Sequence, residues 1–407
     1  MKILYFHQHF TTPQGSGGTR SYEFSKYCVK QNIDVTIVCG KYENGKSGLN
    51  NNFINGMRSG NVDGIRVIEF DIPYSNKDSL LSRSFRFLLY SLKGFKLVFK
   101  EEYDIIFCTS TPLTAALPGI IAKVFRKKPF IFEVRDLWPQ LPLAMGVIKN
   151  PLLILLLSLL EKSAYRFSNV LIGLSPGIIH GIEGKLKYKR NVKLIPNGCD
   201  IDLFSVAGTI WTHDAINEGD FIALYSGTHG KANGLLSIIE AAKILKKENK
   251  KNIKIILIGE GSEKFKLIEI SKDFGLDNII FLDPVGKKEL VSIFHRANVG
   301  LQTLLNVEEF YYGTSPNKFF DYLSAGLPVL TNYPGWIADL IAQHDIGYIA
   351  KPDNPLDFAQ KLIEASEDSF IQSKSKKSLK LASEQFNRQK LAEDFFQVIR
   401  DTYEAKN

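Results

Sequence analysis

The sequence predicts an α/β protein with two Rossmann-like, doubly wound domains that face each other across a cleft. Its 407 residues exceed the roughly 250–300 residues at which a single core stops growing, so two domains are expected. Short apolar strands alternate with helical patterns in two successive series. This alternation is typical of parallel sheets covered by helices.

The first series opens with a strand in "KILYFHQHF", the loop "TTPQGSGGTR", a helical pattern in "SYEFSKYCVKQN" and a strand in "DVTIVCG". Strand, glycine-containing loop, helix and strand form a βαβ unit. Further strands are predicted in "IRVIEF", "DIIFCTS", "PFIFEV" and "NVLIGLS". The amino-terminal half therefore has the pattern of one doubly wound sheet.

The second series has strands in "FIALYSG", "IKIILIGEG", "NIIFLD", "VGLQTLL" and "PVLTN". Between the two series, "NVKLIPNGCDIDLF" reads as a strand running into a turn, which suits a linker. The last helical pattern carries an apolar stripe at Leu391, Phe395, Val398 and Ile399. We therefore place a first domain at 1–190, a second domain at 191–385, and a terminal helix at 386–407.

Charge and cysteines limit the class of protein. Residues 1–190 hold 26 Lys and Arg against 14 Asp and Glu, whereas residues 191–407 hold 25 against 29. The basic first half indicates an anionic partner, which is a membrane surface, a nucleic acid or a phosphorylated substrate. Four separated cysteines without a C-x-x-C pair argue against a zinc site or a disulfide framework. The start lacks the apolar region of a signal peptide, so we expect a cytoplasmic protein.

Candidate site residues follow the strands, because open α/β sheets bind ligands beyond the carboxyl ends of their strands. In the first half these residues are His7, His9, the loop Gly15–Gly18, Thr109–Thr111, Arg135 and Asp136. In the second half they are Gly227–Lys231 and Gly259–Gly261.

The loop "QGSGGTRS" lacks the Gly-Lys-Ser/Thr of a P-loop, and no acidic residue follows about 20 residues later to hold a ribose. ATP hydrolysis and NAD binding are therefore disfavoured. Its glycines would let backbone N–H groups approach an anion, and the alternative is a flexible loop.

Three charged residues, Glu133, Arg135 and Asp136, surround the end of one predicted strand in "FEVRDLWPQLP". This position favours catalysis or acceptor binding over core packing. His7 and His9 alternate along one strand and face the same side; core histidines are the alternative for them.

Lys318 and Asp321 lie in the first turn of the helix predicted in "SPNKFFDYLSAGLPVL". Free backbone N–H groups and the positive end of the helix dipole attract anions there. The pair therefore suits a phosphorylated, hydroxyl-rich ligand, and a surface ion pair is the alternative.

These motifs together resemble a known family. "KLIPNGCDIDLF", "YSGTHGKANGLLSIIEAA", "LIGEGSEKFKL", "FLDPVGKKEL" and "SPNKFFDYLSAGLPVL" are similar to the donor half of retaining glycosyltransferases of family 4, which have the GT-B fold. "HQHFTTPQGSGGTRSYEFSKY", "TSTPLTAALPG" and "FEVRDLWPQLP" resemble the amino-terminal half of its WbuB-like branch, which includes proteins assigned as L-fucosamine transferases of bacterial surface-polysaccharide synthesis. The resemblance covers nearly the whole chain. It implies that residues 1–190 form a Rossmann-like acceptor-binding domain, that residues 191–385 form a nucleotide-sugar donor-binding domain, and that the helix at 386–407 crosses back onto the first domain.

The resemblance implies that Asp321 binds the ribose hydroxyls, since a carboxylate accepts two donors. The family's E-x7-E pattern would place its first glutamate at Gly313, and the usual Arg and Lys of the donor turn fall on Thr228 and Asn233. Lys231 and Lys318 are the nearest candidates to neutralise the diphosphate, and the uracil is expected near Val285. The implied donor-binding residues are Gly17, Gly18, Gly227, Thr228, Lys231, Gly259, Gly261, Val285, Ser315, Pro316, Asn317, Lys318 and Asp321.

The implied reaction moves a sugar from a UDP-sugar, N-acetyl-L-fucosamine being one candidate, to an undecaprenyl-diphosphate-linked saccharide in O-antigen or capsule synthesis. The anomeric configuration is retained by front-face attack, and either the departing phosphate or Asp136 takes the acceptor proton. The catalytic candidates are Asp136, Arg135, Lys231 and Lys318, and the acceptor-binding candidates are His9, Thr111, Glu133 and Arg135. We expect no metal, no other cofactor and no nucleic-acid partner.

Two alternatives remain open. The same fold also carries nucleotide-sugar epimerases and phosphorylases. An inactive partner subunit is the other alternative, because Gly313, Thr228 and Asn233 replace familiar polar residues.

Two apolar segments bear on the location of the protein in the cell. Residues 79–100 contain Arg83, Arg86, Lys93, Lys96 and Lys100 without any acidic residue, which is the composition of a helix in a membrane interface. The alternative is a core-packed helix with a solvated basic edge. "PLLILLLSLL" is too short to span a bilayer and reads as a buried or interfacial helix. We expect peripheral binding at the anionic inner face of the cytoplasmic membrane.

Overall fold

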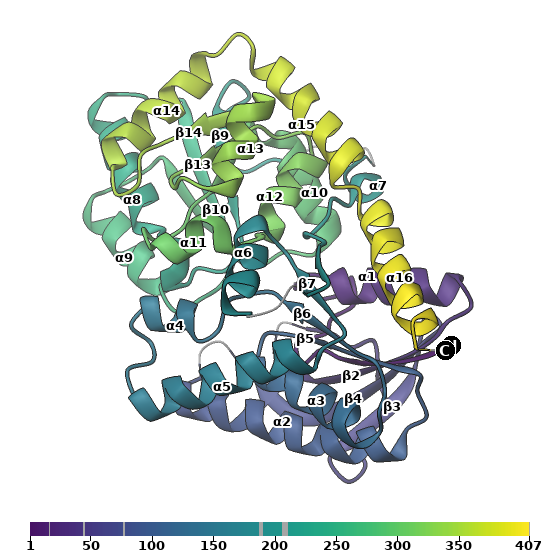
Figure 1. The fold of residues 1–407 in the computed structure, drawn as a ribbon. Helices are drawn as coiled ribbons and strands as arrows, with labels where there is room; N and C mark the ends of the chain where they lie inside the picture. Colours follow the sequence, from purple (N-terminus) through teal and green to yellow (C-terminus); the bar gives the residue numbers. More distant parts are fainter. Residues whose placement is uncertain (16, 44, 76–77, 187–189, 206–210, 407) are drawn as a thin grey trace. The chain divides into compact units, whose positions relative to one another are not determined.

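A computed structural model describes residues 1–407 except residues 16, 44, 76–77, 187–189, 206–210 and 407 (Figure 1). The chain divides into two compact units. The first contains Met1–Asn197, Gly313–Ser315 and the chain from Arg388 onward, and the second contains Gly198–Tyr312 and Pro316–Asn387. The first unit thus extends beyond the predicted boundary at residue 190, because the strand Val192–Leu194 pairs with the first sheet. Of the segment predicted as a terminal helix over 386–407, the part from Arg388 onward belongs to the first unit.

The sheet of the first unit has eight strands among the described residues, in the order β3-β4-β2-β1-β5-β6-β7-β8. All pairs are parallel except β3 with β4. The strands are β1 (Lys2–Phe6), β2 (Asp34–Tyr42), β3 (Met57–Val62), β4 (Ile65–Tyr74), β5 (Ile105–Thr109), β6 (Phe130–Val134), β7 (Val170–Gly173) and β8 (Val192–Leu194).

Helices cover both faces of this sheet, because alternate side chains of each buried strand point to opposite faces. Leu4 and Phe6 join one core with α2, α3, α5 and α6, whereas Ile3 and Tyr5 join the other with α1 and α16. The helices are α1 (Arg20–Lys30), α2 (Leu80–Lys100), α3 (Ala116–Phe125), α4 (Gln140–Ala144), α5 (Pro151–Phe167), α6 (Pro176–Lys185), α16 (Arg388–Glu404) and the 3-10 turn η1 (Leu113–Ala115). The apolar stripe predicted on the last helix lies in the second of these cores.

The sheet of the second unit is parallel throughout its described strands, in the order β11-β10-β9-β12-β13-β14. The strands are β9 (Phe221–Ser226), β10 (Ile253–Ile258), β11 (Ile279–Leu282), β12 (Val299–Gln302), β13 (Val329–Thr331) and β14 (Gly347–Ile349). The order reverses direction at β9 and β12, which makes a topological switch point where ligands of such sheets bind.

Helices also cover both faces of the second sheet. Residues of α8, α9 and α14 share one buried core with alternate residues of β9 and β10. The helices are α7 (Ile201–Phe204), α8 (Leu236–Lys247), α9 (Lys264–Asp273), α10 (Lys287–Arg296), α11 (Glu308–Gly313), α12 (Asn317–Ser324), α13 (Trp336–His344), α14 (Pro355–Glu367), α15 (Ile371–Gln385) and the 3-10 turn η2 (Lys231–Asn233). The two predicted doubly wound domains are confirmed. Among the described residues, no helix combines the length and apolar character needed to traverse a bilayer.

Candidate active site

In the second unit, the turns that follow β9 and β10 are in backbone contact. The Gly227 N–H donates to the Ile258 carbonyl at 2.9 Å, and the His229 N–H donates to the Glu260 carbonyl at 2.8 Å. A Cβ atom on Gly259 would lie 1.9 Å from the Gly227 carbonyl oxygen, a distance that no side chain tolerates. The predicted binding residues Gly227 and Gly259 therefore lie side by side at the switch point, and Gly259 is required there by packing.

Lys318 places its ammonium group beside the turn that follows β9. The Lys318 Nζ lies 3.5 Å from Asn233 Oδ1, 5.1 Å from the centre of the Tyr225 ring, and 3.5 Å from the position of a Cβ on Gly227. Burial lowers the pKa of Lys318 to about 8, although Asp321 acts to raise it. A cation that is buried and poorly solvated is well suited to bind an anion.

Asn233, the position at which the resemblance implies a lysine, accepts from Lys318 Nζ at 3.5 Å. The ammonium group beside this turn thus comes from α12, a different element of the same unit. Lys231 is exposed in η2. Asp321 is partly buried one helical turn after Lys318, and it acts on the Lys318 charge.

The predicted uracil site lies between two loops that a lysine joins. Lys264 Nζ donates to Asp283 Oδ1 at 2.6 Å, to Glu260 Oε1 at 3.0 Å and to the Leu282 carbonyl at 3.2 Å. The loop after β10 is therefore tied to the loop after β11, in which Val285 is half-buried. Lys264 was not among the residues predicted from the sequence. Its position three residues after Gly261, a predicted binding residue, was the one signal that could have pointed to it.

The remaining predicted donor residues of this segment lie around the start of α12. Pro316 precedes the helix and Asn317 is its first residue. The hydroxyl of Ser315 accepts a hydrogen bond from the Asn197 N–H at 3.1 Å, and the Ser315 carbonyl accepts one from Asn197 Nδ2 at 2.6 Å. Ser315 therefore holds the chain at Asn197. That Ser315 contacts the donor stays a prediction. Thr228 is exposed in the turn after β9.

In the first unit, Glu133 forms a fully buried ion pair with Arg20. Arg20 donates to Glu133 Oε2 at 3.0 and 2.9 Å, and Thr109 donates to Glu133 Oε1 at 2.7 Å. The side chains of Arg20 and Glu133 are 1% and 0% exposed. Both carboxylate oxygens are therefore engaged away from solvent, which corrects the prediction that Glu133 contacts an acceptor.

Arg20 was missed at the sequence level, although it directly follows the glycine-containing loop. Besides Glu133, it donates to the carbonyls of Pro196 and Ile195 at 2.5 and 2.8 Å. It thus links the start of α1 to the segment that directly follows β8, the last strand in the order of the sheet. This segment is where the chain leaves the first unit. Gly17 and Gly18, predicted to bind the donor, are half-buried just before α1, and Ser16 between the glycines lies outside the described residues.

His7 connects the ends of β1 and β6. Its Nε2 lies 3.3 Å from Arg135 Nη1, and its Nδ1 lies 2.6 Å from Ser21 Oγ. Because arginine only donates, Nε2 must accept and Nδ1 carries the proton. Burial and the neighbouring Arg135 hold the pKa of His7 well below its usual value, so the ring is neutral.

Arg135 and Asp136 are partly exposed at the end of β6. Asp136 Oδ2 accepts a hydrogen bond from the Thr111 hydroxyl at 2.7 Å, so two residues predicted from separate motifs are brought together. The arrangement offers a cation and a carboxylate side by side at the edge of the sheet.

His9 lies among aromatic rings. Its ring centre is 4.5 Å from that of Tyr74, 5.4 Å from that of Tyr42 and 6.1 Å from that of Phe87. Burial lowers the pKa of His9 to about 3, so this histidine is neutral and cannot act as a cation.

The described residues contain no group of three or more His, Cys, Asp or Glu side chains arranged to hold a metal. One Asp-x-Asp spacing occurs, at Asp200 and Asp202, where the Asp200 carbonyl accepts from the Leu203 N–H at 3.1 Å at the start of α7.

Comparison with known proteins identifies the class. Residues 17–203 match the model of "Glycosyltransferase Family 4", and residues 212–386 match that of "Glycosyl transferases group 1". None of the curated proteins compared with the sequence matches it.

Solved structures with the same fold are distant in sequence. Sucrose-phosphate synthase from Thermosynechococcus elongatus has a TM-score of 0.77 and 15% identity, with 100% of both chains covered. Anabaena HepE in complex with UDP-glucose has a TM-score of 0.70 and 15% identity, covering 98% of this chain and 100% of HepE. WaaG, a glycosyltransferase involved in lipopolysaccharide biosynthesis, has a TM-score of 0.66 and 14% identity, covering 98% and 99%. Together the two matched models and the shared architecture identify the chain as a glycosyltransferase of the family 4 type with the GT-B fold.

Proposed function

We propose that this glycosyltransferase moves a sugar from a UDP-sugar to a lipid-diphosphate-linked saccharide, with retention of the anomeric configuration and without a metal. Bacterial O-antigen or capsule synthesis is the proposed setting, with N-acetyl-L-fucosamine as one candidate donor sugar. The WbuB-like resemblance supports this setting, and structural likeness to HepE with bound UDP-glucose and to WaaG is consistent with it.

The observation that carries the proposal is the poorly solvated ammonium of Lys318 beside the turn after β9, with Asp321 one helical turn away. A nucleoside diphosphate offers the complementary groups, since it has a charged diphosphate next to a ribose with two neighbouring hydroxyls. As the anomeric bond breaks, negative charge grows on the diphosphate, so Lys318 stabilises the transition state more than the bound donor.

In the proposed reaction, the acceptor hydroxyl forms a bond to the anomeric carbon as the bond from that carbon to the UDP oxygen breaks. The bonding electrons leave with UDP, whose phosphate oxygen takes the acceptor proton on the same face. Asp136 orients the acceptor hydroxyl, and its hydrogen bond from Thr111 fixes the carboxylate. Arg135, held by His7, is available for the acceptor phosphate.

Asp321→Ala should weaken UDP binding by roughly 1–3 kcal/mol, because the ribose hydroxyls lose their acceptor. Isothermal titration calorimetry with UDP measures this change. Asp273→Ala, at an exposed position on α9, is the matched control and should bind UDP as the wild type does. Equal UDP affinity in a folded Asp321→Ala protein would remove the ribose assignment.

The membrane part of the proposal rests on the exposed faces of α2 and α5. Large apolar side chains of α2 are exposed along one stripe: Leu81, Phe85, Leu88, Leu92 and Phe99. Five leucines of α5 are exposed as well: Leu152, Leu153, Leu155, Leu156 and Leu159. Both helices pack on α3, on the same face of the first sheet (Figure 1). Apolar surface of this extent marks an interaction site.

The charges of these two helices favour an anionic bilayer as the partner. α2 has no acidic residue, and Glu161 of α5 is buried and paired with Lys185 at 2.7 Å. The exposed cations Lys96, Lys100 and Lys162 lie on the same helices. Arg86 is bound to Asp78, and Lys93 donates to the Gly56 carbonyl at 3.4 Å. Of the basic residues predicted to dock, these two are thus engaged within the protein.

Leu155→Gln with Leu156→Gln should weaken binding to phosphatidylglycerol vesicles by roughly tenfold or more, because each buried leucine contributes about 1.5–3 kcal/mol. Vesicle sedimentation measures this binding. Leu236→Gln with Leu356→Gln replaces two similarly exposed leucines of the second unit and should leave it unchanged. If the wild-type protein stays in the supernatant at low salt, the membrane part of the proposal fails.

A further inference from the structure

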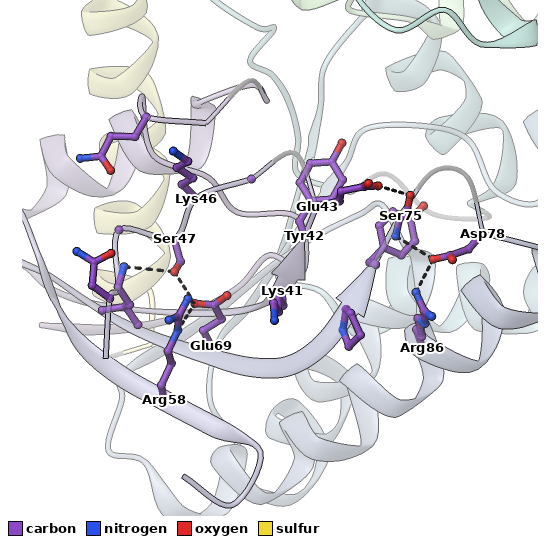
Figure 2. A pocket seen from close by; sticks show the side chains of 17 residues that line it. Lys41, Tyr42, Glu43, Lys46, Ser47, Arg58, Glu69, Ser75, Asp78 and Arg86 are labelled. Carbon is purple, nitrogen blue, oxygen red and sulfur yellow. Dashed lines mark hydrogen bonds and ion pairs between the residues drawn. The ribbon is translucent and has the colours of Figure 1, made fainter. Parts of the chain in front are cut away.

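A pocket of about 540 Å³ lies in the first unit, at the carboxyl ends of β2 and β4 (Figure 2). None of the residues predicted to act in transfer lines it. Its walls come from β2, β3 and β4, from the loops that follow β1, β2 and β4, and from the start of α2. Figure 2 shows polar side chains on opposite sides of it, with Lys41 and Tyr42 between them.

One wall is a buried polar network. Arg58 Nε donates to Glu69 Oε2 at 2.8 Å, and the Ser47 hydroxyl donates to the same carboxylate. Glu69 is 3% exposed and Ser47 is 7% exposed. Such a network is built in advance, since its members hold each other in place without a ligand.

The opposite wall is a second network. Arg86 donates to Asp78, whose carboxylate also accepts from the Ser75 N–H at 2.9 Å, and the Ser75 hydroxyl donates to Glu43. The two walls therefore both combine an arginine, a carboxylate and a hydroxyl. These groups donate and accept in fixed directions, which is the chemistry that recognises neighbouring hydroxyls of a sugar.

Aromatic rings complete the lining. Tyr42 and Tyr74 line the pocket, with ring centres 6.0 Å apart, and both rings contact His9. Ring faces pack against apolar C–H surface, and sugars present such surface between their hydroxyls. The pocket thus combines the polar and apolar groups that a saccharide requires.

The lining of this pocket holds more cations than carboxylates: Lys41, Lys46, Arg58 and Arg86 against Glu43, Glu69 and Asp78. Arg58 and Arg86 are paired with Glu69 and Asp78, whereas the partner of Glu43 is the neutral hydroxyl of Ser75. Lys41 reaches Asp71 at 3.9 Å, with both side chains about half exposed, so this pair is weak. Among the described residues, the exposed Lys46 side chain has no hydrogen bond or ion pair, whereas its backbone is fixed by Thr12 at 2.8 Å.

The order of the strands places this pocket in line with the proposed acceptor residues. Along the carboxyl edge, β4 and β2 carry the pocket, β1 carries His9, and β6 carries Arg135 and Asp136. β2 and β6 are three strand spacings apart, or about 15 Å. A short oligosaccharide covers this distance, whereas a monosaccharide does not.

We propose that the pocket binds the distal part of an acidic oligosaccharide acceptor, with its carboxylate or phosphate at Lys46 and Lys41. The inference rests on the proposed transferase function and specifies its acceptor. The sugar that reacts lies at Arg135 and Asp136, and the chain of the acceptor passes His9 to reach the pocket.

Ligand-observed saturation-transfer NMR tests this proposal with two probes, the acidic hyaluronan disaccharide and the neutral N,N′-diacetylchitobiose. Asn50→Trp fills the pocket from an exposed position that lines it, without removing any wall contact that the structure shows. Asn52→Trp makes the same change at an exposed position outside the lining and is the matched control. Lys46→Gln removes one cation only.

The wild-type protein and Asn52→Trp should bind the acidic disaccharide at least tenfold more tightly than the neutral one. Asn50→Trp should lose binding of the acidic disaccharide at least tenfold, and Lys46→Gln should remove the preference for it. Unchanged binding by Asn50→Trp, equal binding of both probes to the wild type, or no binding of either probe would overturn the pocket assignment. UDP-induced thermal stabilisation, measured on the same samples, reports on the donor site, so failure of the transferase proposal is seen separately.

Discussion

Lys318→Gln should lower turnover by roughly 100-fold or more, the scale seen when a group that stabilises developing charge is removed. The glutamine keeps the approximate length of the side chain and removes its charge beside Gly227 and Asn233. UDP binding should weaken less than turnover falls, because charge on the diphosphate increases toward the transition state.

The release of UDP from the donor in the presence of the acceptor measures this effect. Lys247→Gln, at the exposed end of α8, is the matched control and should keep wild-type turnover. Near-normal turnover of Lys318→Gln would mean that another group stabilises the diphosphate, with Lys231 the first candidate to examine.

Glu133→Gln should lower the free energy of unfolding of the first unit by roughly 3–5 kcal/mol, because it leaves the buried guanidinium of Arg20 without its counter-charge. Urea unfolding measures this loss. Glu183→Gln, at an exposed position of α6, is the matched control and should change the value by less than about 0.5 kcal/mol.

A second variant separates the ion pair from the general cost of altering the core. Replacing both partners, as Arg20→Met with Glu133→Leu, should be less destabilising than Glu133→Gln alone, since no charge is left buried. If Glu133→Gln is as stable as the wild type, the pair does not hold the first unit together.

The sequence was sufficient to predict the strands that are apolar on both faces. Buried parallel strands read as continuous apolar runs, and "DIIFCTS", "PFIFEV" and "IKIILIGEG" all became central strands. The edge strand β3 was missed, because "MRSGNV" is polar and contains glycine and therefore lacks that signal. The rule that ligands bind beyond strand ends pointed to Thr111 and Asp136, which share a hydrogen bond, and to Gly227 and Gly259, which lie side by side.

Burial of individual side chains could not be predicted from the sequence. Glu133 and Arg135 are two residues apart on one strand end, yet Glu133 is fully buried and Arg135 is partly exposed. The partner of Glu133, Arg20, is 113 residues distant in sequence, so no local pattern reveals the pair. The exposure of the α5 leucines could not be predicted either. An apolar run of this kind fits a buried helix as well as a helix with an exposed apolar face, and the structure shows the exposed face.

The pKa of Lys318 provides the most direct test of the central claim that this cation binds the diphosphate. With a pKa of about 8, half of the free protein carries a neutral Lys318 at pH 8. A bound diphosphate favours the charged form and raises this pKa, so UDP binding must take up protons. The affinity for UDP should therefore fall as the pH rises above about 8.

Calorimetric titration of UDP at pH 8, repeated in buffers of different ionisation enthalpy, counts these protons. The UDP phosphates are already ionised at this pH and contribute little to the count. The account predicts uptake of about half a proton per UDP by the wild-type protein and none by Lys318→Gln. UDP binding without proton uptake by the wild type, or with equal uptake by Lys318→Gln, would contradict it.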